Sequence, residues 1–196
     1  SPNHTGLGKK ASIMTDGEWQ TPIGNIKIDS EIANSLVDNC DILENDEDAH
    51  INEHSIELEL PFIYHKRNDV QIVPITLKYL SFEECCKIAT AIAETIADNN
   101  NDILILASSD MSHGETLQAT EKKDNLAIDR ILAIDHKGLY DTVIQNNITM
   151  CGFIPATIML YASIKLNATK AVLVKKTNSF EISGRKDYIV GYVSMY

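Results

Sequence analysis

The residues best suited to chemistry in this sequence follow an apolar run and lie between Ser108 and His113. The run itself, Ile103–Ala107, is too short to cross a membrane and is typical of a strand buried on both faces of a parallel sheet. In open α/β sheets, ligand sites lie just beyond the carboxyl ends of the strands, so we expect Asp110 and His113 at such a site. Helix capping would explain Asp110 equally well, but it gives no reason for His113. We therefore predict that the two residues are catalytic and transfer protons.

Four further residues with metal-binding or acid–base side chains stand at expected loops or helix starts: His4, Glu53, His54 and Cys151. Imidazole combined with thiolate or carboxylate suits a first-row transition metal such as iron, zinc or copper. The same residues would also suit a thiol nucleophile activated by a histidine. Sequence spacing does not separate these two classes of site, because the partners meet only in the folded chain. The absence of GxGxxG, GxxxxGK[ST] and HExxH motifs argues against nucleotide-binding and zincin functions.

Cys151 comes just before an apolar segment that ends near Lys165 and contains Pro155, a residue that suits the first turn of a helix. A thiol at a helix N-terminus has a lowered pKa, because the helix dipole and the free amides stabilise the thiolate. The alternative is a small buried core residue, which is the commonest role of a free cysteine.

The elements that would position these residues alternate between strands and helices. Val70–Leu77 reads as a second buried strand, and Phe82–Ala97 has the pattern of a long amphipathic helix. Together with Ile103–Ala107 they predict a right-handed strand–helix–strand unit with parallel strands. We therefore expect an α/β fold with a mostly parallel central sheet flanked by helices. The other expected elements are a weak strand Ala11–Met14, an irregular extended connection Trp19–Ile28, helices Glu31–Asp38, Ala119–Ala133 and Lys137–Ile144, and β-rich segments Ala171–Lys176 and Tyr188–Tyr196.

Glu53 and His54 open a segment in which Ile56, Leu60 and Ile63 have the spacing of one buried helical face. Asn52 would cap this helix, and Pro61 would end or kink it near Leu60. An ordinary amphipathic helix explains the later glutamates, so only Glu53 and His54 remain as candidates for a pocket.

Composition narrows the class of protein further. The 28 acidic and 17 basic side chains give a net charge of −11, which argues against a nucleic-acid partner bound through phosphates. The sequence contains no apolar stretch of membrane-spanning length. The four cysteines show neither metal-finger spacing nor a disulfide framework, which favours reduced thiols and a cytoplasmic protein.

Four blocks of sequence together resemble the Memo family, which is related to the class III extradiol dioxygenases, and most closely its archaeal members. The blocks are Ser1-Pro-Asn-His4, Glu53-His-Ser-Ile-Glu-Leu-Glu-Leu-Pro-Phe62, Ser108-Ser-Asp-Met-Ser-His113 and Met150-Cys-Gly152, and the ending from Ser183-Gly184 to Val190-Gly191-Tyr192 is also similar. The resemblance implies a single α/β domain over residues 1–196. It also implies that His4 and Cys151 are metal ligands and that Asp110 and His113 line the same pocket.

The resemblance further implies a metal-dependent redox or dioxygenase-like protein that uses iron or copper and acts on an unknown substrate. In the dioxygenase relatives a carboxylate stands where this sequence has Cys151, which favours copper or redox chemistry over ring cleavage. The family's first metal histidine, in a Pro-His-Ala-Gly-like stretch, has no counterpart here, so we expect an incomplete N-terminus. The alternative function is a non-catalytic module that holds a peptide or protein partner in the same pocket.

Overall fold

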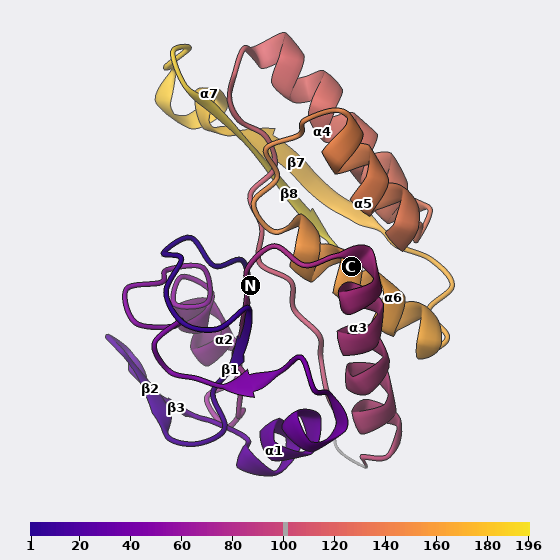
Figure 1. Ribbon diagram of the computed structural model, residues 1–196. Helices are drawn as coiled ribbons and strands as arrows, with labels where there is room; N and C mark the ends of the chain where they lie inside the picture. The colour runs from indigo at the N-terminus through magenta and orange to yellow at the C-terminus, as the bar shows by residue number, and fades with distance from the viewer. Residues whose placement is uncertain (100–101) are drawn as a thin grey trace. The chain divides into compact units, whose positions relative to one another are not determined.

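The computed structural model describes residues 1–99 and 102–196, and it has the predicted α/β class. Its contacts divide the chain into two compact units, Ser1–Ser108 and Ser109–Tyr196, which are described separately (Figure 1). The expectation of one domain over residues 1–196 stays a prediction.

The sheet of the first unit is built around β1 (Ala11–Ile13), whose three residues are all buried. β1 pairs in parallel with β4 (Glu44–Asn45) and antiparallel with β5 (Ile75–Leu77). The second predicted strand therefore forms, but it is shorter than expected and runs against its neighbour. The sheet is mixed, and the strictly parallel form of the predicted arrangement is not found among the described strands.

Two helices of this unit match the expected segments closely. α1 (Ser30–Asn39) begins after Asp29, whose side chain accepts the main-chain N–H of Ile32. α3 (Phe82–Ala97) begins with a complete capping box, in which Ser81 and Glu84 each bond the other's main chain. The two helices lie side by side in the lower part of Figure 1.

Two local predictions in this unit are wrong. The segment expected to be irregular is a hairpin of β2 (Glu18–Thr21) and β3 (Gly24–Lys27). The helix expected to end near Leu60 instead begins there, as α2 (Leu60–Lys66), with Pro61 in its first turn. Proline is favoured at that position because the first N–H groups of a helix have no partner inside it. Glu53 and His54 consequently lie before the helix, in an irregular stretch between two turns.

The apolar run Ile103–Ala107, expected to be a strand buried on both faces, forms no regular secondary structure. Its exposure alternates, and Leu104 and Leu106 are 86% and 54% exposed. This alternation is that of an extended chain with one face covered, since side chains in extended backbone point to opposite sides in turn. The strand–helix–strand unit therefore does not form in the part of the chain that the structure describes.

The second unit contains a sheet in the order β6–β8–β7, in which both pairings are antiparallel. Helices α4 (Leu117–Leu132) and α5 (His136–Gln145) lie along one side of the paired strands β7 (Leu173–Asn178) and β8 (Ile189–Met195) (Figure 1). A buried cluster that includes Met111, Ile128, Leu139 and Met150 forms the core. The elements are β6 (His113–Glu115), α4 (Leu117–Leu132), α5 (His136–Gln145), α6 (Phe153–Lys165), β7 (Leu173–Asn178), α7 (Ser179–Ser183) and β8 (Ile189–Met195).

In this second unit, α4, α5, α6, β7 and β8 confirm the predicted segments to within a few residues. β6 and the short α7 were not predicted. Among the described residues, none of the helices is both long enough and apolar enough to span a membrane.

Candidate functional site

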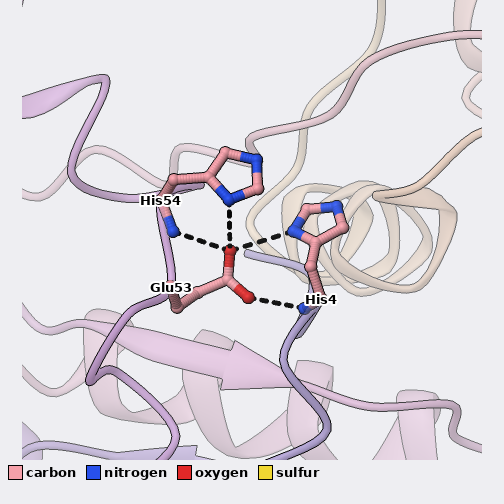
Figure 2. Close-up of side chains that lie close together, drawn as sticks. All are labelled: His4, Glu53 and His54. Carbon is pink, nitrogen blue, oxygen red and sulfur yellow. Dashed lines mark hydrogen bonds and ion pairs between the residues drawn. The ribbon is translucent and has the colours of Figure 1, made fainter.

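Glu53 is the centre of a polar cluster in the first unit (Figure 2). Its side chain is only 1% exposed, and the main-chain N–H groups of His4, His54 and Ser55 donate to it at 2.5, 2.9 and 3.1 Å. The Nδ1 atoms of His4 and His54 lie 2.9 and 3.3 Å from its Oε1 atom. The reversal of the chain that permits these bonds includes Asn52, whose φ of 63° is in the left-handed region that asparagine tolerates.

Burial by itself would raise the pKa of Glu53, but the hydrogen bonds from the side chain and main chain of His4 and from the main chains of Ser55 and His54 lower it to about 2. Glu53 is therefore a carboxylate at neutral pH. An ionised carboxylate has roughly four acceptor positions. The contacts from His4, His54 and Ser55 converge on Oε1, and the main-chain N–H of His4 donates to Oε2, so we assign Glu53 the role of acceptor that orients these groups.

Within the described residues, one group of three His, Cys, Asp or Glu residues has ligand atoms close enough for a metal, all within 4.8 Å of one another. The group is His4, Glu53 and His54. Nδ1 of His54 makes a 3.3 Å ion-pair contact to Glu53, whereas the imidazole of His4 is hydrogen-bonded to the carboxylate at 2.9 Å and, because a carboxylate only accepts, presents a protonated Nδ1 to it. The Nε2 atom is then the one with a free lone pair, and Figure 2 shows both Nε2 atoms on the sides of the rings away from Glu53.

A carboxylate behind Nδ1 is the arrangement that commonly orients a metal-binding histidine. The two rings are stacked, with centroids 4.7 Å apart and planes 27° apart. The ring planes are close to parallel, so a single ion in the plane of one ring does not lie in the plane of the other. His4, whose Nδ1 is hydrogen-bonded to Glu53 at 2.9 Å against 3.3 Å for the Nδ1 contact of His54, is the better-oriented of the two.

The second unit brings His113 and Asp110 together. The Nε2 atom of His113 lies 3.3 Å from Oδ2 of Asp110. On the other side of the ring, Nδ1 lies 2.7 Å from the carbonyl oxygen of Thr149. A carbonyl oxygen only accepts, so Nδ1 must carry a hydrogen. Nε2 is therefore the atom of His113 available for proton transfer, and it faces the Asp110 carboxyl group.

Cys151 lies beside the same residues, at the turn before α6. The main-chain N–H of Asp110 donates to its sulfur at 3.1 Å, and Ser109, whose hydroxyl accepts the N–H of Gly152 at 2.9 Å, lies 3.9 Å away. Burial nevertheless raises the pKa of the Cys151 thiol. The expectation that the helix N-terminus lowers this pKa is therefore wrong, because desolvation of the sulfur outweighs the nearby amide. The raised pKa argues against the hypothesis that Cys151 is a thiolate nucleophile at neutral pH.

Two residues of the second unit, Asp124 and Gly191, hold the loop that carries Asp110 and His113. Asp124, buried on α4, accepts the main-chain N–H of Ser112 at 2.9 Å. The main chain of Gly191 on β8 makes two further bonds to this loop. Its carbonyl oxygen accepts the N–H of Met111 and its N–H donates to the carbonyl oxygen of Ser112, both at 2.9 Å. A Cβ atom on Gly191 would overlap the Asp124 carboxylate, so a larger residue there would displace that side chain.

The six predicted residues thus fall into two groups. His4, Glu53 and His54 meet in residues 1–108, and Asp110, His113 and Cys151 meet in residues 109–196. Sequence reasoning missed Thr149 and Asp124. Thr149 stands two residues before Cys151, which is a signal that could have drawn attention to it. Asp124 gives no such signal, because it reads as one more polar residue of an amphipathic helix.

Comparison with known proteins identifies the class of protein. The family model described as Memo-like protein matches residues 1–196. A MEMO1 family protein of Methanocaldococcus jannaschii is 41% identical over 197 residues, which cover 98% of this chain and 68% of that protein. A MEMO1 family protein of Saccharolobus islandicus is 42% identical over 195 residues, with the same coverages of 98% and 68%. A third, from Methanothermobacter thermautotrophicus, is 37% identical over 194 residues, covering 99% of this chain and 70% of that protein.

The chain therefore belongs to the Memo family, and the predicted resemblance is confirmed.

Proposed function

We propose that this Memo family protein is a metal-dependent redox or dioxygenase-like protein that uses iron or copper, with His4 and Cys151 as ligands. The observation that carries the proposal is the hydrogen bond between the buried Glu53 carboxylate and Nδ1 of His4, at 2.9 Å. It directs the free Nε2 lone pair of His4 to the side of the ring away from Glu53 (Figure 2). A neutral imidazole oriented in this way is the form in which histidine binds a metal ion.

The donors available in each unit suit the proposed metals. Imidazole nitrogen suits iron and copper, and thiolate sulfur is a soft ligand that favours copper and redox-active iron. The Asp110 N–H that reaches Cys151 at 3.1 Å would stabilise the sulfur as a thiolate ligand. Metal binding requires that thiolate, so it would also supply the driving force to remove a proton whose pKa burial raises.

A bound iron or copper ion would supply one-electron chemistry and polarise an oxygen-containing ligand. The protein's own residues would handle the protons. His113, with Nδ1 held by the Thr149 carbonyl, presents Nε2 as the atom that gives or takes a proton. The carboxyl group of Asp110, 3.3 Å from Nε2, would exchange that proton with His113. The substrate class that fits this chemistry is a small molecule with an oxidisable or ionisable oxygen group.

The experiment is a measurement of iron and copper content by mass spectrometry on protein purified without oxygen. We expect the wild type to bind iron or copper, and His4→Ala and Cys151→Ala each to bind less of it. His65→Ala, which removes an exposed histidine of α2, is the matched control and should keep the metal. A wild-type protein without metal, or variants that both keep it, would overturn the proposal. The first of these results would favour a non-catalytic module that binds a peptide or protein partner.

A further inference from the structure

Thr149 makes an unusual set of contacts for an exposed residue. Its hydroxyl oxygen accepts the main-chain N–H of His113 at 2.7 Å and lies 3.2 Å from the carbonyl oxygen of His113, to which it donates. Its own carbonyl oxygen accepts from Nδ1 of the His113 ring at 2.7 Å. One residue therefore binds the donor and the acceptor of the His113 main chain and one nitrogen of its ring.

The ring contact has a chemical consequence. A neutral imidazole carries its hydrogen on either Nδ1 or Nε2, and the hydrogen bond made by one nitrogen decides which. A carbonyl oxygen 2.7 Å from Nδ1 would repel a lone pair there, so it selects the form with hydrogen on Nδ1. Oδ2 of Asp110 lies 3.3 Å from Nε2 and would favour hydrogen on that nitrogen instead, but this contact is longer than the 2.7 Å contact of Nδ1 and is therefore the weaker of the two.

The main-chain contacts hold His113 next to the Thr149 carbonyl that selects its tautomer. Two atoms of the His113 backbone are bonded to the Thr149 hydroxyl, which holds the His113 main chain beside the Thr149 carbonyl, and the bond from Nδ1 to that carbonyl then orients the ring. From the other direction, Met111 and Ser112 are bonded to Gly191 of β8, which holds the preceding part of the loop. His113 is thus held by main-chain bonds from β8 to the residues before it and from Thr149 to its own backbone.

We propose that Thr149 is a positioning residue that fixes His113 in the Nδ1–H tautomer and so makes Nε2 its proton-transferring atom. This inference rests on the proposed function, since it assigns the tautomer of the residue that would transfer the proton there. It adds a residue that the sequence motifs do not contain and a specific state of the imidazole.

The test is the tautomer of His113 in metal-free protein, read from the ¹⁵N chemical shifts and long-range couplings of its two ring nitrogens. We expect the wild type to show hydrogen on Nδ1. Thr149→Val removes the hydroxyl and keeps the size of the side chain, so the backbone of His113 is released. We expect the ratio of the two tautomers to shift toward Nε2–H by roughly fivefold to tenfold, the factor that one net hydrogen bond provides.

Two further variants separate positioning from a general effect on structure. Thr149→Ser keeps the hydroxyl and should retain the wild-type spectrum. Thr169→Val makes the same change at an exposed threonine elsewhere in the second unit and should also leave His113 unchanged. An Nε2–H tautomer in the wild type, or equal tautomer ratios in wild type and Thr149→Val, would overturn the inference. Because the protein is metal-free, these outcomes do not depend on whether the proposed metal binds.

Discussion

The substitution Glu53→Gln tests the role of Glu53 directly, because it replaces the carboxylate by a neutral group of the same shape. Glu53 receives main-chain N–H bonds from three residues as well as the imidazole of His4. A glutamine amide has only one acceptor oxygen, so its NH₂ group must face at least one of these donors. The side chain is 1% exposed, and water cannot replace the lost acceptor.

The expected loss of stability follows from these contacts. A hydrogen bond to a charged group contributes about 1.5–3 kcal/mol, and a buried donor left without a partner costs a further 1–3 kcal/mol. With partial compensation by the amide oxygen, we expect Glu53→Gln to lower the free energy of unfolding by about 3 kcal/mol. Loss of an outer acceptor behind a metal-binding histidine typically costs 10–100-fold in metal affinity, and we expect a decrease of roughly that size for copper.

The assay combines urea unfolding followed by circular dichroism with a competition titration of Cu²⁺. Glu57→Gln is the matched control, since Glu57 is exposed in the same segment. The stability difference should also depend on pH. The pKa of Glu53 is lowered from 4.5 to about 2, so its contribution is complete above pH 4.5 and is lost as the pH falls toward 2. Copper affinity and unfolding midpoints of Glu53→Gln equal to those of Glu57→Gln would refute the assigned role.

Two further predictions concern stability and the support of the catalytic loop. Burial lowers the pKa of His50 from 6.5 to about 4, so the folded protein binds a proton there less readily than the unfolded chain does. The folded state should therefore lose about 3 kcal/mol of stability as the pH falls from 6.5 to 4, and keep it above pH 6.5. His50→Gln should flatten this part of the curve of unfolding free energy against pH, and equal slopes in both proteins would contradict the reasoning. Gly191→Ala should lower the unfolding free energy by about 1–3 kcal/mol, because its Cβ displaces the Asp124 carboxylate from the Ser112 amide. The same variant should broaden or shift the ring resonances of His113, whereas Gly6→Ala, at a glycine with open space around it, should leave them unchanged.

The sequence by itself determined the longer helices, α1 and α3 to α6, because helix formation depends on caps and periodicity within a few residues. Asp29 before α1 and the Ser81–Glu84 capping box before α3 could be read from neighbouring letters, and the structure has both. Family membership was also determined by sequence, since the blocks around His4, Asp110 and Cys151 occur together and in order.

The pairing of the strands, and the role of residues whose local pattern allows two structures, could be seen only in the tertiary structure. A strand needs a partner from elsewhere in the chain, and an apolar run such as Ile103–Ala107 does not reveal whether it has one. Pro61 is compatible with either the end or the start of a helix, and only the packed chain shows that α2 starts there.

The candidate site shows the same division. The residue types of His4, Glu53, Asp110, His113 and Cys151, together with their places at expected loops and helix starts, were sufficient to select them. Their roles depended on contacts between distant segments. Glu53 became an acceptor once the His4 backbone lay against it, 49 positions away in sequence. Thr149 became important once its carbonyl met the His113 ring, 36 positions away. Burial at Cys151 reversed the pKa shift that its place before a helix had predicted. Hydrogen bonds and desolvation depend on distances in space, and those distances exist only in the folded chain.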